Sequence, residues 1–312
     1  IILKANPAYW GKKPALRQII FRTERDAGKR SRLIAGGKAD VIDAAPEEIP
    51  YLAKKGVRIL RTPGADVSYL GFYTNKKPFQ NPLVRQAACL AINQPQLVKD
   101  LFYDNAIAAN GPLPPGILGH AAELRQPPFN PQQSRRLLAA AGYPDGLPIT
   151  IITYAGERPY NPAGGEKLAQ VLARQLTGGG FQAAVRAYPW EKFKQALLQQ
   201  EGDAFLYGWI SDNGDPDNFL YTLFSSAQIA SGLNATRYHN QRVDTLLITA
   251  QRTPDPALRA RLYRDVQEQL LRDKPAFFIN HSLLPVAVSP AVQNFSVHPG
   301  NFFCFQNATK QK

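Results

Sequence analysis

The sequence contains no methionine and only two cysteines among its 312 residues. It opens on Ile1-Ile2-Leu3, without an initiator methionine or a signal-peptide pattern, so we expect a fragment that lacks an N-terminal portion. Cys89 lies in an apolar stretch and is expected to be a small buried hydrophobic residue. Cys89 and Cys304 could pair only if the fold brought their Cα atoms within about 7 Å, so cysteine usage does not indicate the compartment.

Long apolar runs and enzyme motifs are missing as well. No run approaches the 18 or so apolar residues that a membrane-spanning helix needs. There is no Gly-x-Ser-x-Gly elbow, Walker loop, His-Glu-x-x-His or Gly-x-Gly-x-x-Gly motif. The four histidines share no metal-ligand spacing: His120, His239, His281 and His298. We therefore expect no enzyme, no resident metal and no cofactor, although a carboxylate pair for glycoside hydrolysis stays open because its separation in space is unknown.

Acidic residues are few relative to basic ones, with 24 Asp and Glu against 37 Lys and Arg and a net charge of +13. Such an excess is typical of proteins that bind nucleic acid or acidic membranes. More than half of it falls within residues 1–61, which hold 14 Lys and Arg against 6 Asp and Glu. Those basic residues are spread among apolar ones, as on a solvated basic face. We therefore expect no nucleic-acid partner.

Strand-like and helix-like segments alternate in the middle of the chain. A β-branched strand at 149–154 is followed by a helix at 165–176, a strand at 181–188, a helix at 190–200 and a strand at 204–209. This β-α-β-α-β order predicts a parallel sheet with right-handed crossovers.

Further segments extend the pattern on both sides. The other expected helices are 28–36, 81–91, 95–103, 130–142, 241–251 and 256–272, and the other expected strands are 15–22, 57–62 and 276–279. In the helix at 130–142, Asn130 is the expected N-cap and Gly142 the expected C-terminal stop. We therefore expect an α/β lobe at 76–283, and another lobe to which 1–75 and 284–312 both belong.

An acidic segment follows the last strand of the alternation. Residues 208–219 have the sequence Gly-Trp-Ile-Ser-Asp-Asn-Gly-Asp-Pro-Asp-Asn-Phe and lead into an apolar helix start. By themselves, Asp212, Asp215 and Asp217 could serve a metal, a catalytic step or solvent exposure. Their spacing fails the EF-hand pattern, and Pro216 stiffens the loop unfavourably for calcium. A loop that is anchored at both ends and rich in acceptors is suited to present charge to a ligand.

Two charged residues lie where this strand order places a ligand. In open parallel sheets, ligands bind outside the carboxyl ends of the strands. Arg158 follows the strand at 149–154 and Asp212 follows the strand at 204–209, so both belong to one sheet edge. Arg158 offers a planar fork suited to a carboxylate, and Asp212 suits an ammonium. A free amino acid or short peptide carries both groups; the alternative is that Arg158 and Asp212 pair with each other or face solvent.

Six segments, in the same order as in a known family, carry a resemblance that covers nearly the whole chain. They are ANPAYWGKKP at 5–14, GKADVI at 37–42, NPLVRQA at 81–87 with LAIN at 90–93, LLAAAGYPDG at 137–146, RPYNP at 158–162 and the acidic segment at 208–219. Together they resemble the family 5 extracellular solute-binding proteins, which deliver ligands to ABC importers. Within that family the chain is most similar to the periplasmic dipeptide-binding proteins.

The resemblance implies an α/β, two-lobed periplasmic-binding-protein-like fold with mixed sheets and a hinge, which closes over its ligand. It implies the substrate-binding component of an ABC importer, located in the periplasm or extracellular and membrane-anchored. The implied partner is an inner-membrane ABC permease, and the implied oligomeric state is a monomer.

The resemblance also implies a ligand. In dipeptide-binding members, the aspartate that matches Asp212 binds the amino group of the ligand, and the arginine that matches Arg158 binds its carboxylate. We therefore expect a dipeptide or short peptide, held by an Asp/Arg clamp between the two lobes. The other candidate ligand-binding residues are Trp209, Tyr160, Gly208 and Ser211.

The sequence departs from the family pattern, and alternatives follow. The family's chains usually begin well upstream of Ile1, and the cysteine pair of many dipeptide-binding members is absent, with Ser225 or Ser226 and Tyr238 in those places. The segment 90–103 is similar to Sap-type peptide-binding relatives, and haem binding occurs among close relatives. A solute-binding domain fused to a transcription regulator and a hydrolase are the alternatives from other classes.

Overall fold

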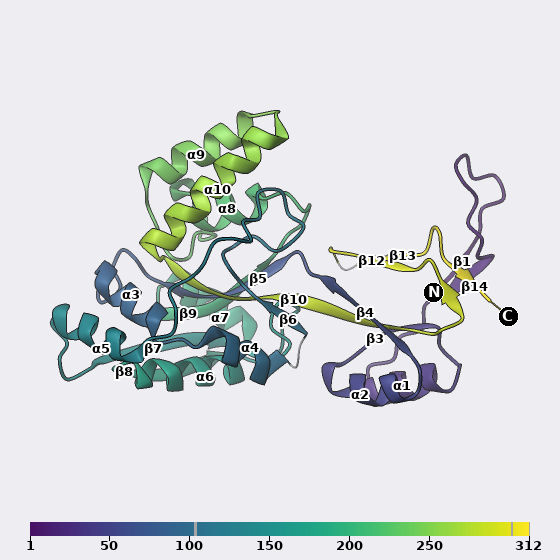
Figure 1. The fold of residues 1–312 in the computed structure, drawn as a ribbon, viewed down its shortest axis with the longest axis horizontal. Coiled ribbons are helices and arrows are strands. Elements are labelled where there is room, and N and C mark those ends of the chain that lie inside the picture. The colour runs from purple at the N-terminus through teal and green to yellow at the C-terminus, as the bar shows by residue number, and fades with distance from the viewer. Residues whose placement is uncertain (103–104, 301, 312) are drawn as a thin grey trace. The chain divides into compact units, whose positions relative to one another are not determined.

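Figure 1 shows the computed structural model, which describes residues 1–102, 105–300 and 302–311. The chain divides into two compact units, a larger one at Ala65–Ser282 and a smaller one that combines Ile1–Gly64 with Leu283–Lys312. The lobe boundaries expected from the sequence, at 75/76 and 283/284, concern a complete two-lobed protein and stay a prediction.

The larger unit is built around a mixed sheet. Its strands are β5 (Asp66–Phe72), β6 (Ala106–Ala108), β7 (Leu147–Tyr154), β8 (Phe181–Tyr188), β9 (Ala204–Ile210) and the first part of β10 (Ala276–Val288). In the order β10-β5-β9-β7-β8, β7 has two parallel neighbours, whereas β5 runs antiparallel to both β9 and β10. The short β6 pairs with β10. The predicted β-α-β-α-β run is confirmed as the parallel part of a mixed sheet.

Helices cover both faces of this sheet (Figure 1). They are α3 (Pro82–Leu90), α4 (Gln94–Phe102), α5 (Pro131–Ala140), α6 (Gly165–Gly178), α7 (Trp190–Leu198), α8 (Asp217–Phe224), α9 (Gln241–Arg252) and α10 (Pro256–Asp273), with a 3-10 turn at Ser226–Gln228. Along β7, Ile152 and Tyr154 pack with α7 to α10, while Ile149 and Ile151 pack with α3 to α6. The alternation of side chains along a strand thus builds a separate core on each face.

The predicted signals at the ends of α5 are confirmed. Asn130 Oδ1 accepts a hydrogen bond of 2.9 Å from the backbone N–H of Gln133. Gly142 follows the helix with a φ of +95°, a left-handed conformation that glycine adopts without steric cost. The last residue of the helix predicted at 95–103, Tyr103, lies outside the described residues.

The smaller unit is made of short elements. They are β1 (Ile2–Lys4), β2 (Gln18–Ile20), α1 (Ala27–Ala35), β3 (Val41–Asp43), a 3-10 turn (Pro46–Glu48), α2 (Ile49–Lys54), β4 (Arg58–Pro63), β11 (Val292–Gln293), β12 (Ser296–His298), β13 (Phe302–Cys304) and β14 (Thr309–Lys310). Residues 283–288 of β10 pair with β3 and β4, so this one strand takes part in both units. The predicted strand at 57–62 and helix at 28–36 are confirmed, whereas only three residues of the predicted strand at 15–22 are paired.

Both cysteines are free. Cys89 is buried in α3, as expected, and Cys304 is partly exposed. Across the residues that the structure describes, no helix has the length and apolar character needed to cross a membrane.

Candidate functional site

The two loops singled out from the sequence leave the sheet at one edge. β7 and β9 are parallel neighbours, with Ile151 opposite Ala204 and Ile152 opposite Phe205. Their carboxyl ends therefore lie side by side. The loop after β7 carries Arg158, and the loop after β9 carries Asp212. This is the arrangement that the strand-end argument requires.

The loop after β7 is fixed by its own backbone. The N–H of Arg158 donates to the carbonyl of Asn161 at 3.1 Å, and the N–H of Asn161 donates back to the carbonyl of Arg158 at 2.8 Å. Asn161 is fully buried, and its Nδ2 donates to the hydroxyl of Tyr154 at 3.0 Å. The carbonyl of Tyr160 accepts from Nδ2 of Asn280, at 3.2 Å, on β10. The turn is therefore tied to two strands of the sheet before any ligand binds.

The guanidinium of Arg158 rests on an aromatic ring and lacks an anion. Its Cζ lies 3.7 Å from the centre of the Trp190 ring and 5.9 Å from that of Tyr154. Within the described parts of the chain, the Arg158 side chain makes no ion pair, and its Nε is buried without a hydrogen-bond partner. A buried charged donor without an acceptor is costly, so this group is suited to take an anion from outside the chain.

Tyr160 and Gly208 lie in direct contact. A Cβ placed on Gly208 would lie 2.3 Å from Cδ2 of the Tyr160 ring, so only glycine fits beneath that ring. Tyr160 is 4% exposed and packs edge-on against Tyr154. Burial raises the pKa of both phenols well above the ordinary value, so both stay neutral. The structure thus places Tyr160 in the core that supports the site.

The start of the acidic loop is organised around Asn218. The Oδ1 of Asn218 accepts from Nε1 of Trp209 at 2.9 Å and from the backbone N–H of Asp212 at 3.2 Å. Its Nδ2 donates to the Asp212 carboxylate at 3.4 Å. Ser211 is buried, and its hydroxyl accepts from the N–H of Gly214 at 2.8 Å. The backbone of Asp212 is therefore held while its carboxylate stays exposed.

The other two carboxylates of the loop anchor it to the helices behind. Asp215 accepts two hydrogen bonds from Arg259, at 2.7 and 2.9 Å. Burial acts to raise the pKa of Asp215, but the hydrogen bonds from Arg259 and from the backbone of Asp217, together with the charge of Arg259, hold that pKa below its ordinary value. Asp217 accepts from Gln251 at 3.0 Å, and Asp215 Oδ1 also accepts from its backbone N–H. Asp215 and Asp217 thus fix the turn and the start of α8.

Arg158 and Asp212 do not pair with each other. Among the described residues, neither forms an ion pair. The alternative that the two side chains pair with each other is therefore wrong, whereas the alternative that they face solvent agrees with the exposure of Asp212. The structure brings Tyr160 onto Gly208, and joins Trp209 to Asp212 through Asn218, but records no contact between Arg158 and the acidic loop.

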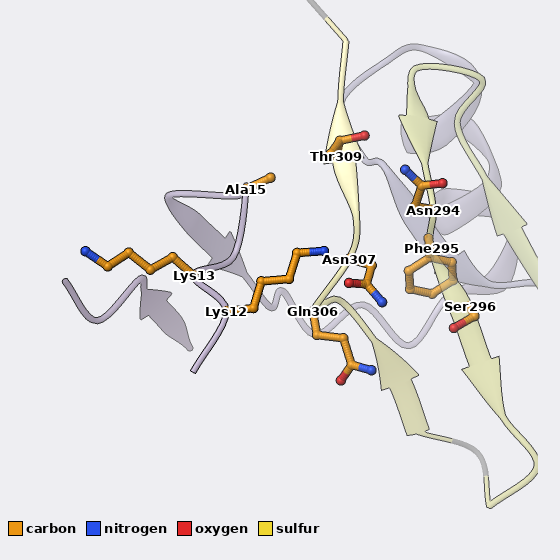
Figure 2. Close-up of a pocket in the computed structure, with 9 residues that line it drawn as sticks. All are labelled: Lys12, Lys13, Ala15, Asn294, Phe295, Ser296, Gln306, Asn307 and Thr309. Carbon is orange, nitrogen blue, oxygen red and sulfur yellow. The ribbon is translucent and has the colours of Figure 1, made fainter. Parts of the chain in front are cut away.

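A cavity of about 710 Å³ lies elsewhere, in the smaller unit (Figure 2). Its walls are Lys12, Lys13, Ala15, Asn294, Phe295, Ser296, Gln306, Asn307 and Thr309. In Figure 2 the Lys12 ammonium extends toward Asn307, while Lys13 points away. None of the ligand-binding residues predicted from the sequence lines this cavity. No three His, Cys, Asp or Glu side chains of the described residues form a group that could hold a metal ion.

Comparison with known proteins identifies the chain. Residues 1–231 match the model of the bacterial extracellular solute-binding proteins, family 5, middle region. The chain belongs to this family. Members of the family are solute-binding proteins rather than enzymes, in agreement with the missing enzyme motifs.

The relatives of this chain are named after different ligands. It is 29% identical to the dipeptide-binding protein of Escherichia coli (strain K12), over 98% of this chain and 57% of the relative. It is also 29% identical to heme-binding protein A of Haemophilus influenzae, over 96% of this chain and 55% of the relative. The solved structure of HbpA2 from Haemophilus parasuis superposes with a TM-score of 0.94 at 31% identity, over 100% of this chain and 61% of that one. The chain thus spans less than two thirds of the length of each.

Sequence reasoning did not single out Trp190, Asn218 and Arg259 as parts of this candidate site. Trp190 is the first residue of α7 and closely follows the end of β8. The rule that ligands bind outside the carboxyl ends of parallel strands, which pointed to Arg158, therefore also applies to Trp190. No comparable signal marks Arg259, because its contact with Asp215 joins segments that are far apart in the sequence.

Proposed function

We propose that this family 5 protein is the substrate-binding component of an ABC importer, and that it captures dipeptides or short peptides through Arg158 and Asp212. The observation that carries the proposal is the unpaired guanidinium of Arg158, stacked on Trp190 with its Nε buried. The C-terminal carboxylate of a peptide is a planar anion that accepts two parallel hydrogen bonds from such a fork. Similarity to the E. coli dipeptide-binding protein supports this choice of ligand.

Asp212 supplies the second half of the clamp. Its carboxylate is exposed at the same sheet edge, and among the described residues its side chain bonds only to the neutral amide of Asn218. An ammonium group suits this acceptor, because an ammonium and a carboxylate form a charge-assisted hydrogen bond. In the proposal, Trp209, Gly208 and Ser211 surround the ligand's amino end, and Tyr160 supports them from the core.

The proposal extends to the setting of the complete protein. We place it in the periplasm, or outside the cell on a membrane anchor, where it works as a monomer with two lobes that close over the peptide. It then hands the peptide to an inner-membrane ABC permease. The extracellular character of the family supports this placement.

Isothermal calorimetry with the dipeptide Ala-Leu tests the clamp. We expect Asp212→Ala and Arg158→Ala each to weaken binding by about 30- to 1,000-fold, because truncation leaves one charged end of the ligand unpaired. Glu157→Ala and Arg174→Ala are matched controls, since both residues are exposed charges of the same unit and neither has a partner among the residues that the structure describes. Both controls should bind as the wild type does. Wild-type affinity in Asp212→Ala and Arg158→Ala would refute the clamp.

Haem is the second candidate ligand, favoured by the similarity to heme-binding protein A of H. influenzae. Haem carries two propionate carboxylates and no ammonium group. Haem binding should therefore depend on Arg158 and tolerate Asp212→Ala, whereas dipeptide binding needs both side chains. The same two variants thus distinguish the two ligands.

A further inference from the structure

Trp190 stacks on the guanidinium of Arg158, the group that the proposed clamp assigns to the ligand's carboxylate. The Arg158 guanidinium lies over the Trp190 ring at 3.7 Å from its centre, a distance typical of face-on stacking. Trp190 is partly exposed and is the first residue of α7. The N–H groups of a guanidinium point outward in its plane, so stacking covers one face and leaves the donors at the edge free to bind.

The indole ring is itself held in place from several sides. Its centre lies 5.8 Å from the ring centre of Tyr154, 5.9 Å from that of Phe193 and 6.1 Å from that of Tyr207. Tyr154 and Phe193 are fully buried, and Tyr154 is also tied to the Arg158 turn through Asn161. The ring therefore has a fixed orientation before Arg158 packs on it.

We propose that Trp190 is a positioning residue that fixes the Arg158 fork for the ligand's carboxylate. This inference rests on the proposed function, which assigns Arg158 to that carboxylate. An arginine side chain has many rotamers, and holding it in one conformation before binding removes an entropic cost from the binding step. Without the ring, Arg158 swings into solvent and must be ordered by the ligand.

A purely structural Trp190 would give a different result. If the ring only filled the core, its replacement would weaken all ligands alike, whether or not they carry a carboxylate. If it positions Arg158, its replacement must weaken the free acid more than the carboxyl amide. The ratio of the dissociation constants of Ala-Leu amide and Ala-Leu therefore isolates the positioning role.

The experiment measures this ratio for the complete natural chain and three variants. Trp190→Leu removes the aromatic face and keeps an apolar side chain, while Trp190→Phe keeps a smaller face. Phe224→Leu is the control, because Phe224 is a buried aromatic residue of the same core whose ring contact, among the described residues, is with Phe278 and not with Trp190 or Arg158. We expect a high ratio in the wild type and in Phe224→Leu, a ratio about 5- to 30-fold lower in Trp190→Leu, and an intermediate value in Trp190→Phe.

The outcomes separate this inference from the function on which it rests. An unchanged ratio in Trp190→Leu, with a high ratio in the wild type, overturns the role of Trp190 and leaves the clamp intact. A wild-type ratio near one contradicts the clamp itself, and the positioning role with it. If Trp190→Leu does not fold, Trp190→Phe decides by the same ratio. The NMR signal of the Arg158 Nε–H gives a second readout without ligand: we expect a ring-current shift that shrinks in Trp190→Phe, and its absence in the wild type contradicts the stacking.

Discussion

Some residues of the candidate site could be predicted because they follow the carboxyl end of a strand. Others could be recognised only from their packing in the structure. Arg158 and Asp212 follow parallel strands directly, so topology alone placed them at one edge. The packing of Tyr160 on Gly208 depends on a contact between the loop after β7 and strand β9, which are distant in the sequence. Such contacts leave no periodic signal. The sequence could therefore predict charged candidates at this edge, but not the side chains that hold them.

Gly208→Ala tests the contact beneath the loop after β7. The added Cβ would lie 2.3 Å from the Tyr160 ring, so the ring must move out of its buried position. We expect a loss of about 1–3 kcal/mol in the free energy of unfolding, measured with urea, as is usual for overpacking. Gly178→Ala is the control, because a Cβ at the end of α6 meets nothing within 4 Å and alanine favours a helix. Equal stability of Gly208→Ala and wild type would contradict this packing.

Among the secondary-structure elements, the regularly alternating strands and helices could be predicted from the sequence. Buried strands that contain polar residues could not. The strands and helices from β7 to β9 have apolar residues with clear periodicity, and all five were predicted. β5 is buried along its whole length, but Asp66 and Ser68 interrupt its apolar pattern, and it was missed. The strand predicted at 276–279 covers only the first part of β10, because the polar residues Asn280, His281 and Ser282 interrupt its apolar pattern.

Tertiary partners explain why those polar residues can lie within strands. Ser282 donates its backbone N–H and its hydroxyl to the Asp66 carboxylate, and Nδ1 of His281 hydrogen-bonds the Asp66 carbonyl at 2.7 Å. The Asp66 carboxylate and Ser282 therefore satisfy each other, whereas Oγ of Ser68, Oδ1 of Asn280 and Nε2 of His281 are buried without a hydrogen-bond partner among the described residues. These residues lie where the chain passes between the two units, at Gly64 to Ala65 and at Ser282 to Leu283.

This buried pair of strands predicts an unusual pH dependence. Burial raises the pKa of Asp66 from 3.8 to about 6, so its contribution to stability is present below pH 4 and is lost as pH rises to 6. Burial lowers the pKa of His281 from 6.5 to about 4, so its contribution is lost as pH falls through the same range. The two dependences oppose each other. The wild type should therefore show little net change between pH 4 and 6.

Asp66→Asn removes the pH dependence that Asp66 adds to stability, leaves that of His281, and keeps the shape of the side chain. Between pH 4 and pH 7, the free energy of unfolding of Asp66→Asn should gain about 3 kcal/mol relative to the wild type, because the variant avoids ionising a buried group. Urea unfolding at several pH values measures this difference. Parallel pH curves for the two proteins would rule out the raised pKa of Asp66.

For the molecule as a whole, the α/β class, the mixed sheet and the family were predictable because six ordered segments span the chain. The sequence did not predict that one strand, β10, takes part in both units, because only residues 276–279 were expected as a strand. The net charge of +13 gave no guide to the ligand, since the proposed clamp rests on two single charges, Arg158 and Asp212. Both residues belong to the larger unit, so the chemistry of the ligand can test the proposed clamp directly.

The most direct test of the proposed clamp removes one charge from the protein and one charge from the ligand, separately and together. Calorimetry compares Ala-Leu, N-acetyl-Ala-Leu and Ala-Leu amide in the wild type, Asp212→Asn and Arg158→Gln. If a protein charge and a ligand charge interact, removing both weakens binding by less than the sum of the two single losses in binding free energy. We predict that Asp212→Asn weakens Ala-Leu strongly but N-acetyl-Ala-Leu little further, and that Arg158→Gln behaves in the same way toward the amide. Fully additive losses in both pairings would show that Asp212 and Arg158 do not hold the two ends of the peptide.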